Sequence, residues 1–382
     1  MKIATLLFTY HRYEHTKKTI DALSKNTELP EYLIVFQDGK NNKTDIGGWD
    51  KVNALINEIN FCPTEVIVHD KNRGLANSIV EGINYAMKSF DAVIVIEDDC
   101  VTAKGFMSFM VQALKQYEQY EKVLQIGGYS IPFFDESKEE LLFYGRAETW
   151  GWATWKEKWK LYDNKDRDLI ERICNDKRLS TNLGIWGGDL FDMYCAQIEG
   201  KIDSWAVFWA LSFIENDGVV LAPRKSLVSN IGLDGSGTNC TSMDIYDVCL
   251  DEKIVQYNYP KEIVIDQVLA NNFSQHFGYG IAQNTDASKP HVIIYGLGIF
   301  FRKNAKWIMN NYYIEGVMDK KIEKYKYYLG KKVMSISDAI VSRSIILIMI
   351  MDVEESIKIK NDLVLQGIDA NRILTAFGGN IN

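Results

Sequence analysis

Residues 92–99 read Ala-Val-Ile-Val-Ile-Glu-Asp-Asp, an apolar and largely β-branched run that ends in three acids. An uninterrupted apolar run of this kind is typical of a parallel strand that is buried on both faces. Open α/β sheets bind ligands beyond the carboxyl ends of such strands, so we expect Glu97, Asp98 and Asp99 in a binding crevice. Clustered acids repel one another, and a divalent cation that also contacts phosphate oxygens would balance them. The stretch therefore indicates a site for a nucleoside diphosphate, and its alternative interpretation is a strand that ends in solvated acids.

Strands and helices alternate before this stretch. Apolar runs predict strands at 3–8, 32–36 and 65–68, with helical segments at about 16–24 and from about 75 to 89. This spacing is typical of βαβ units, which predicts an α/β fold with a parallel sheet and right-handed crossovers. The predicted strands all end in polar residues, which would meet at one edge of the sheet: Thr9 to Arg12, Asp38, Asn72 with Arg73, and Glu97 to Asp99. We therefore expect a single binding site at this edge.

The order of these motifs resembles the nucleotide-sugar half of a GT-A glycosyltransferase, and it is most similar to bacterial sugar transferases of family 2. The motifs are Thr9-Tyr10-His11-Arg12, Gln37-Asp38-Gly39, Asn72-Arg73-Gly74-Leu75 and Glu97-Asp98-Asp99. The second and the last also resemble N-acetylglucosaminyltransferase I. Residues 145–155 (GRAETWGWATW) and 227–232 (LVSNIG) resemble acceptor-side segments of the bacterial group. The resemblance spans roughly residues 1–285 and implies a GT-A fold with a Rossmann-like nucleotide-sugar-binding sheet.

The resemblance implies how the donor would be bound. Thr9 and Tyr10 would line the base pocket, and Asp38 would accept a hydrogen bond from uracil. Arg12 and Arg73 would meet the diphosphate, because a guanidinium matches phosphate oxygens in pairs. The structural alternatives are a turn beside a glycine for Asp38 and a surface position that opens a helix for Arg12.

The resemblance also implies a divalent cation, Mn²⁺ or Mg²⁺, that bridges Asp99 to both phosphates of a nucleotide sugar, favoured as UDP-linked. Glu97 and Asp98 would hold metal-bound waters or hydroxyl groups of the donor sugar. Trp150 and Trp152 would lie on the acceptor side, and the acceptor would be a glycan or a lipid-linked or protein-linked sugar. Bacterial surface polysaccharide or glycoprotein biosynthesis is the implied setting.

Transfer with inversion needs one general base, which takes the proton from the acceptor hydroxyl. The candidates are Asp203, Asp189 and Asp192, all in the second half of this region. Asp203 best matches the acid that precedes a tryptophan in N-acetylglucosaminyltransferase I, although a shift of one residue would place Ser204 there. Many relatives carry an acid directly after this tryptophan, where this chain has Ala206. The three candidates therefore stay open.

Composition and charge limit the possible partners and the cellular location of the protein. The net charge of −8 and the pI near 5.3 argue against a nucleic-acid partner. The first apolar run is expected to be a strand rather than a signal peptide, and the run at 345–351 is too short to cross a bilayer. We expect a cytoplasmic protein. The Lys- and Tyr-rich stretch 320–332 would allow contact with the inner face of the membrane, although a solvated helix face is favoured. A homo-oligomer stays open.

Six cysteines show neither a CxxC pair nor a neighbouring histidine. They are expected to be free thiols in a reducing compartment rather than disulfides or a zinc site. They are Cys62, Cys100, Cys174, Cys195, Cys240 and Cys249.

A polar stretch near 281–290 predicts a boundary between a domain at 1–285 and a small Rossmann-like domain at 290–382. The second domain would begin with a strand at 291–295 and the turn Gly296-Leu297-Gly298, with Asp319 after the next strand. Phe301 stands where a third glycine would fall, so we favour a packing or partner-binding role over a bound nucleotide.

Two other hypotheses stay open for the whole chain. One is a sugar-modifying oxidoreductase that works through the Gly-x-Gly turn, and the other is a non-catalytic protein that binds a nucleotide or a carbohydrate. The oxidoreductase lacks a Tyr-x-x-x-Lys motif beside a complete Gly-rich turn, and it leaves the acids at 97–99 unexplained. A nucleotidyltransferase is disfavoured because the loop after the first strand contains no glycine.

Overall fold

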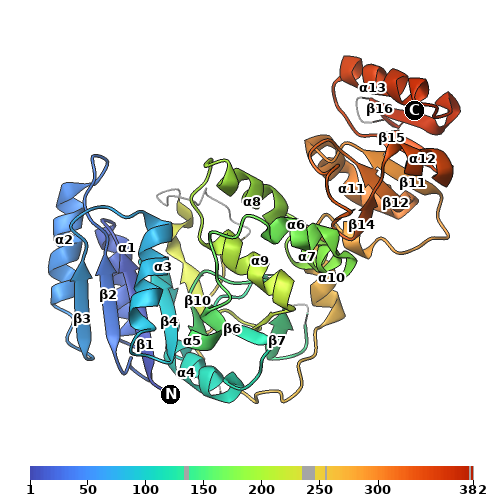
Figure 1. The fold of residues 1–382 in the computed structure, drawn as a ribbon. Coiled ribbons are helices and arrows are strands. Elements are labelled where there is room, and N and C mark those ends of the chain that lie inside the picture. The colour runs from blue at the N-terminus through green and yellow to red at the C-terminus, as the bar shows by residue number, and fades with distance from the viewer. Residues whose placement is uncertain (133–136, 235–245, 254–255, 378–379, 382) are drawn as a thin grey trace. The chain divides into compact units, whose positions relative to one another are not determined.

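The computed structural model of the chain describes residues 1–132, 137–234, 246–253, 256–377 and 380–381 (Figure 1). Cys240 lies outside these residues, and the five described cysteines form no disulfide with one another. The described chain divides into two compact units. The first comprises Met1–Lys165 and Ala196–Leu269, and the second comprises Asp166–Cys195 and Ala270–Asn382. None of the helices in the described part is long and apolar enough to cross a membrane.

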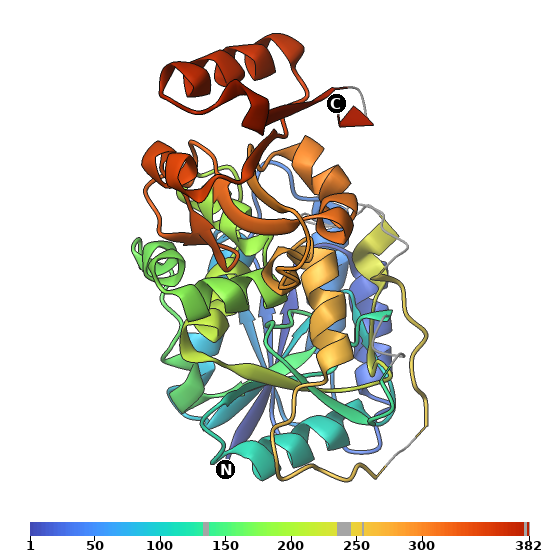
Figure 2. The same ribbon diagram turned by 90° about the vertical axis from the view of Figure 1, so that its right-hand side faces the viewer.

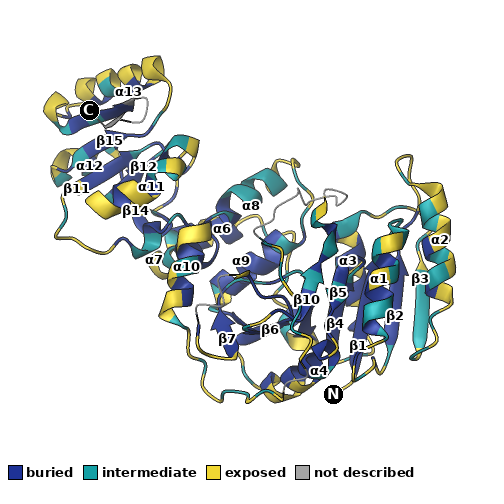
Figure 3. Cartoon of the chain, turned by 180° about the vertical axis from the view of Figure 1, so that it is seen from behind, coloured by how far each residue is buried: buried dark blue, intermediate teal, exposed yellow. Residues whose placement is uncertain are grey.

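The described residues of the first unit form an eight-stranded sheet in the order β3-β2-β1-β4-β8-β6-β9-β7. The four strands at one side are parallel: β1 (Ile3–Thr9), β2 (Leu33–Gln37), β3 (Thr64–Val68) and β4 (Ala92–Glu97). The rest of the sheet is mixed: β6 (Val123–Gly127), β7 (Leu141–Tyr144), β8 (Trp152–Trp155) and β9 (Val219–Pro223). The apolar runs of β1, β2 and β4 are buried, whereas the edge strand β3 is only partly covered (Figure 3).

Helices cover both faces of this sheet. The helix α3 (Leu75–Ala86) packs against Phe8 and Phe36, where the missing side chain of Gly82 lets the helix approach closely. The helix α4 (Phe106–Tyr117) lies on the opposite face, because its Met107 contacts Thr5 and residues 5 and 8 point to opposite sides of β1. The other helices of this unit are α1 (Tyr13–Leu23), α2 (Ile46–Asn57), α5 (Lys156–Trp159) and α9 (Ala206–Asn216).

A two-stranded ribbon extends the carboxyl end of β4. The strand β5 (Cys100–Thr102) follows β4 after the turn at Asp98 and Asp99, and it pairs antiparallel with β10 (Val228–Asn230). A short 3₁₀ helix, Ile231–Asp234, follows β10. This ribbon brings residues 228–232 to the acids that end β4.

The second unit contains its own seven-stranded sheet, again counted over described residues, in the order β13-β14-β12-β11-β15-β16-β17. The strands β11 (His291–Tyr295), β12 (Tyr313–Met318), β15 (Ile345–Ile348) and β16 (Ile373–Phe377) are parallel. The strand β14 (Lys331–Val333) is parallel to β12, whereas β13 (Tyr327–Tyr328) and β17 (Asn380–Ile381) pair antiparallel with their neighbours. This order, with β11 beside both β12 and β15, is that of a doubly wound sheet.

The helices that follow strands of this sheet are α11 (Ile299–Asn311), α12 (Ile336–Ser342) and α13 (Val353–Leu365), and Figure 2 shows α13 lying along the C-terminal strands. The core beneath α13 contains Ile346, Ile348, Ile359, Leu363 and Ile373. The chain therefore has the α/β class predicted from the sequence, with a large parallel-rich sheet and a second, smaller α/β sheet.

The compact units differ from the predicted division at 285. The helices α6 (Leu169–Asn175), α7 (Lys177–Trp186) and most of α8 (Leu190–Ile198) belong to the second unit, as does most of α10 (Gln267–Phe277). The ring of Phe191 in α8 packs edge-on against Tyr325 and Tyr328, with centroids 5.7 and 5.3 Å away. Packing between segments that are about 130 residues apart is not visible in the local pattern around residue 285. Independent function of the two predicted domains stays a prediction.

Candidate functional site

The acids at the end of β4 lie in a tight and largely buried turn. Asp98 and Asp99 are only 6% and 7% exposed, and Glu97 is half-buried. Two hydrogen bonds from neighbouring segments hold the backbone of this turn. Thr19 Oγ1 donates to Asp98 O at 2.9 Å, and the backbone N of Ile231 donates to Asp99 O at 2.9 Å. The carboxylates therefore follow the central strand β4, and α1 and the segment after β10 hold their backbone in place.

Arg12, which directly precedes α1, contacts the two aspartates of the turn. Its Nη2 donates to Asp98 Oδ1 and, at 2.7 Å, to Asp99 Oδ2, while its Nε lies 3.4 Å from Asp98 Oδ2. Its Nη1 is buried and has no hydrogen-bond partner among the described residues. Burial alone would lower the pKa of Arg12, but the two carboxylates outweigh this effect and raise the pKa above its ordinary value.

The three acids outnumber the single guanidinium. Burial raises the pKa of Asp98 to about 6, with Arg12 opposing and Asp99 adding to the shift. Burial, followed by repulsion from Asp99 and Asp98, raises the pKa of Glu97 well above its ordinary range. A further positive charge would relieve this repulsion.

The donor set fits a hard divalent cation that takes part of its shell from the substrate. The side chains that end β4 offer only oxygen ligands, which Mn²⁺ and Mg²⁺ prefer. Among the described residues, no group of three or more His, Cys, Asp or Glu side chains is arranged to hold a metal by itself. One or two carboxylates completed by phosphate oxygens is the arrangement that Mg²⁺ often adopts in nucleotide-binding enzymes. The residues therefore fit the predicted cation at Asp99 only together with a phosphate-bearing ligand.

Gly232 packs closely against both Asp99 and Arg12. A Cβ atom at this position would lie well under 3.0 Å from Asp99 Oδ2 and 3.0 Å from Arg12 Nη1. The backbone N of Gly232 donates to Asn230 Oδ1 at 2.8 Å, which fixes this approach. The sequence predicted 227–232 as an acceptor-side segment, and it missed that Gly232 packs directly against the acids. The glycine directly after Asn230-Ile231 was the available signal.

Asp38 organises the loop that carries Arg73. Its Oδ1 accepts hydrogen bonds from the backbone N of Gly39 and of Arg73, both at 2.8 Å. Its Oδ2 accepts from Asn72 Nδ2 at 2.9 Å and from the backbone N of Gly74 at 3.1 Å. A carboxylate has about four acceptor positions, so these bonds use the capacity of Asp38. The predicted hydrogen bond from uracil to Asp38 stays a prediction, and it would require an oxygen that is already shared.

The other predicted donor residues lie at the same sheet edge. Thr9 is buried at the end of β1, and its Oγ1 donates to Phe36 O at 3.1 Å. Tyr10 stacks on His11 with ring centroids 4.2 Å apart, and its hydroxyl lies 2.5 Å from Thr44 Oγ1. Arg73 is half exposed and lies 3.8 Å from Glu81 at its Nε. Arg73 is therefore available to a ligand, whereas Thr9 supports the loops around it.

The two predicted acceptor-side tryptophans differ in position. Trp152 is fully buried in β8 and stacks on Trp205 with a centroid distance of 5.3 Å, so it belongs to the core and does not face an acceptor. Trp150 is partly exposed, and its ring contacts Tyr129 and Tyr246 edge-on at 4.7 and 6.2 Å. The prediction for Trp152 is therefore corrected, because aromatic content alone does not distinguish a core residue from a sugar platform.

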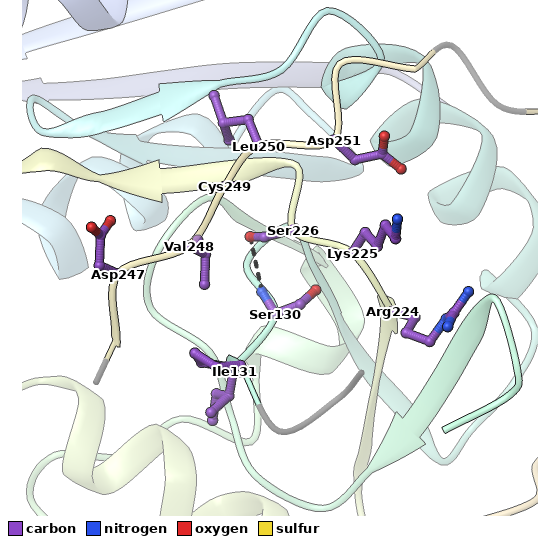
Figure 4. Close-up of a pocket in the computed structure, with 11 residues that line it drawn as sticks. Ser130, Ile131, Arg224, Lys225, Ser226, Asp247, Val248, Cys249, Leu250 and Asp251 are labelled. Atoms are coloured by element: carbon purple, nitrogen blue, oxygen red, sulfur yellow. Dashed lines mark hydrogen bonds between the residues drawn. The ribbon is translucent and has the colours of Figure 1, made fainter. Parts of the chain in front are cut away.

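A cavity of about 350 Å³ begins next to the contacts of Trp150. Two of its lining residues, Ser130 and Asp247, are the chain neighbours of Tyr129 and Tyr246. Figure 4 shows Arg224 and Lys225 on one side of this cavity and Asp247 on the other. The remaining described lining is Ile131, Pro132, Ser226, Val248, Cys249, Leu250 and Asp251. The first unit thus has a hollow with a mixed polar and apolar lining near the partly exposed tryptophan.

Of the three base candidates, Asp203 lies in the unit that contains the acids. It is exposed, and its Oδ2 is 3.5 Å from the position that a Cβ of Gly74 would take, so it lies beside the loop held by Asp38. Asp189 and Asp192 belong to the second unit, where the carboxylate of Asp192 forms an ion pair with Arg302.

The Gly-x-Gly turn of the second unit is tied to Asp319. Gly296 has a positive φ of 91°, and Asp319 Oδ2 accepts a hydrogen bond from the backbone N of Leu297 at 2.9 Å. The Oδ1 atom of Asp319 accepts from the backbone N of Lys321 at 2.9 Å. Phe301 is buried in α11, at 1% exposure. Asp319 therefore serves the turn itself, and no observation here favours the oxidoreductase hypothesis.

Part of the chain is similar in sequence to known glycosyltransferases. Residues 6–171 match the family model of glycosyl transferase family 2. A curated relative, the glucosyl-dolichyl phosphate glucuronosyltransferase of Haloferax volcanii, is 26% identical over 144 residues, which cover 37% of this chain and 42% of that protein. The match thus spans less than half of the relative's length.

Two solved structures are also similar to part of the chain. The mannosyltransferase PcManGT from Pyrobaculum calidifontis, in complex with GDP-Man and Mn²⁺, has 13% identity and a TM-score of 0.31 over 45% of this chain and 46% of that chain. S. aureus TarS 1–349, in complex with UDP-GlcNAc, has 12% identity and a TM-score of 0.32 over 60% and 58% of the two chains. The match of residues 6–171 to glycosyl transferase family 2 confirms the resemblance that the sequence motifs predicted.

Proposed function

We propose that this chain is a metal-dependent, inverting glycosyltransferase that moves a sugar from a nucleotide sugar to a hydroxyl group of a glycan or glycoconjugate. One observation carries the proposal: within the family 2 domain, buried acids and an arginine with a free donor meet at the carboxyl end of a central parallel strand. This is the edge at which open α/β sheets bind nucleotides.

Different residues around the acids would bind different parts of the nucleotide sugar. Tyr10 offers an aromatic face for the base, and UDP is the carrier that the sequence resemblance favours. The half-exposed guanidinium of Arg73 and the unpartnered Nη1 of Arg12 are hydrogen-bond donors suited to phosphate oxygens. A divalent cation bound at Asp99 would neutralise the departing nucleoside diphosphate. Glu97 and Asp98 would then orient the donor sugar or its waters.

Asp203 is the proposed general base. A base must reach the acceptor hydroxyl while the donor lies in place, and Asp203 is an exposed carboxylate beside the donor-side loop. Ala206, at the first position of α9, has no group that could take this role. Asp189 and Asp192 stay as alternatives for activity assays, and the ion pair with Arg302 already engages Asp192.

The acceptor would approach from the side of Trp150. Its partly exposed ring and the neighbouring cavity together offer an aromatic face, two cations and two acids. Aromatic faces with polar neighbours are suited to sugars. The predicted role in bacterial surface polysaccharide or glycoprotein biosynthesis, and the predicted place at the cytoplasmic side of a membrane, rest on the sequence and its resemblance alone.

A thermal-shift and hydrolysis screen of the full chain tests this proposal. UDP- and GDP-linked sugars would be tested with Mn²⁺, with Mg²⁺ and with excess chelator, and release of free nucleoside diphosphate would be measured. We expect stabilisation by a nucleotide sugar only in the presence of the cation, with slow hydrolysis of the same donor. A chain that is stabilised by none of these donors contradicts the proposal. Equal binding in excess chelator contradicts the metal assignment.

A further inference from the structure

Arg12 contacts the carboxylate of Asp99, which the proposed function assigns to a divalent cation. Its Nη2 lies 2.7 Å from Asp99 Oδ2 and also bonds Asp98 Oδ1. The side chains of Arg12, Asp98 and Asp99 are only 18%, 8% and 10% exposed. Charge-assisted hydrogen bonds that are shielded from water are much stronger than exposed ion pairs. A cation that binds Asp99 must therefore compete with a well-formed interaction.

Little space is left for Arg12 and a cation to share Asp99 Oδ2. Gly232 crowds this oxygen from one side, to the extent that even a methyl group would collide with it. Arg12 Nη2 contacts the same oxygen at 2.7 Å. A guanidinium and a divalent cation at one oxygen would also repel each other across a few ångströms in a poorly solvated turn. We therefore expect that Arg12 leaves Asp99 when a cation binds there.

Arg12 has a donor with which to make a new contact. The guanidinium carries five N–H donors, and those on Nη1 are buried and have no acceptor among the described residues. A buried charged donor without a partner is costly, which indicates that an acceptor joins it during function. The phosphate oxygens of the donor would be such acceptors, because the cation at Asp99 binds to the same diphosphate.

We propose that Arg12 is a built-in counter-ion of the acid turn, and that it moves from Asp99 to the donor diphosphate when the cation and the nucleotide bind. This inference rests on the proposed function. It makes binding of the cation and of the nucleotide mutually dependent, because each frees a partner for the other. Such coupling is reciprocal: the factor by which UDP tightens Mn²⁺ binding equals the factor by which Mn²⁺ tightens UDP binding.

Calorimetric titration of Mn²⁺ into the full chain, with and without saturating UDP, tests the inference. Arg12→Met removes the counter-ion and keeps much of the side-chain length. It should bind Mn²⁺ without UDP roughly 10–100-fold more tightly than the unaltered chain, because a charged hydrogen bond no longer competes. It should also show a smaller effect of UDP on Mn²⁺ affinity. Lys17→Met is the matched control: it removes one positive charge from the exposed Lys17–Asp21 pair in α1 and should leave Mn²⁺ affinity within about twofold.

The outcomes separate this inference from the proposed function. Unchanged or weaker Mn²⁺ binding in folded Arg12→Met, with UDP binding intact, overturns the counter-ion role and leaves the proposed function standing. Tighter Mn²⁺ binding by the variant, in a chain that binds no nucleotide, supports the counter-ion role and contradicts the proposed function. If Arg12→Met does not fold, Mn²⁺ affinity is compared in the unaltered chain and in Arg12→Lys. Equal Mn²⁺ affinity of the unaltered chain with and without UDP overturns the inference. An increase in Mn²⁺ affinity with UDP that is smaller in Arg12→Lys supports it.

Discussion

Substitution of Gly232 by alanine should disable the acid turn by adding one methyl group. The new Cβ would lie well under 3.0 Å from Asp99 Oδ2 and 3.0 Å from Arg12 Nη1. Asp99 cannot retreat freely, because its backbone O accepts from Ile231 N at 2.9 Å. The carboxylate must therefore rotate away, which breaks its 2.7 Å contact with Arg12 Nη2.

The cost can be worked from these contacts. Loss of a hydrogen bond between charged groups costs about 1.5–3 kcal/mol, and forcing a methyl group into a packed site costs about 1–3 kcal/mol. Replacing glycine by alanine restores about 0.4–1 kcal/mol through the unfolded chain. We expect a net loss of about 1.5–5.5 kcal/mol in the free energy of unfolding. We also expect loss of cation-dependent UDP binding at temperatures where the variant is folded.

Urea denaturation monitored by tryptophan fluorescence, together with UDP calorimetry in Mn²⁺, measures both effects. Gly105→Ala is the matched control in the same unit, because its Cβ would meet no described atom closer than 3.8 Å and its φ of −88° suits alanine. The control should keep UDP binding and change stability by less than about 1 kcal/mol. If Gly232→Ala is as stable as the unaltered chain and binds UDP equally, the packing of Gly232 against Asp99 is refuted.

Three further changes test other parts of the account. Asp203→Asn should lower turnover by roughly 10²–10⁴-fold with UDP affinity nearly unchanged, because a general base acts only as the bond forms. Normal turnover in this variant would leave Asp189 and Asp192 as the candidates for the base. Burial raises the pKa of Glu148 to about 7 from an ordinary value of 4.5, so the folded state holds its proton longer than the unfolded state, and stability should fall as pH rises between these values. Glu148→Gln should remove this pH dependence of the free energy of unfolding. The variant should be more stable than the unaltered chain at pH 8, by at most about 3 kcal/mol, and equally stable near pH 4. The same pH dependence in denaturation series of both chains would contradict the raised pKa of Glu148. A chain ended after Asn284 should unfold at lower temperature, because Phe191 loses the rings of Tyr325 and Tyr328, whereas an unaltered melting temperature would show that residues 166–195 need no such partner.

The parallel part of the sheet could be predicted from the sequence because its signals are local. The runs at 3–8, 32–36 and 92–96 are apolar on both faces, and polar residues mark where each strand ends. The structure places β1, β2 and β4 side by side, with their carboxyl ends at one edge. Strand ends at one edge bring Arg12 and Asp99 together although 87 positions separate them. The family match to residues 6–171 confirms the resemblance read from these motifs.

Features that depend on tertiary packing were not predictable in the same way. Trp150 and Trp152 are two residues apart with the same chemistry, and only the position of Trp152 in a central strand buries it. Asp38 and Gly39 resemble a ligand-binding turn in the sequence, yet the loop at 72–74 already fills the carboxylate of Asp38. The place of residues 166–195 in the second unit depends on aromatic contacts that are distant in sequence.

The most direct test of the central claim is calorimetric titration of UDP into the full chain and its Asp99→Asn variant, each with Mn²⁺ and with excess chelator. Asp21→Asn is the matched control, because Asp21 is an exposed acid whose ion pair with Lys17 lies on the surface of α1. We predict that the unaltered chain and Asp21→Asn bind UDP only with Mn²⁺, and that folded Asp99→Asn loses this dependence together with most of its affinity. Equal UDP affinity in Asp99→Asn and the unaltered chain, or no binding of UDP by either, would contradict the account.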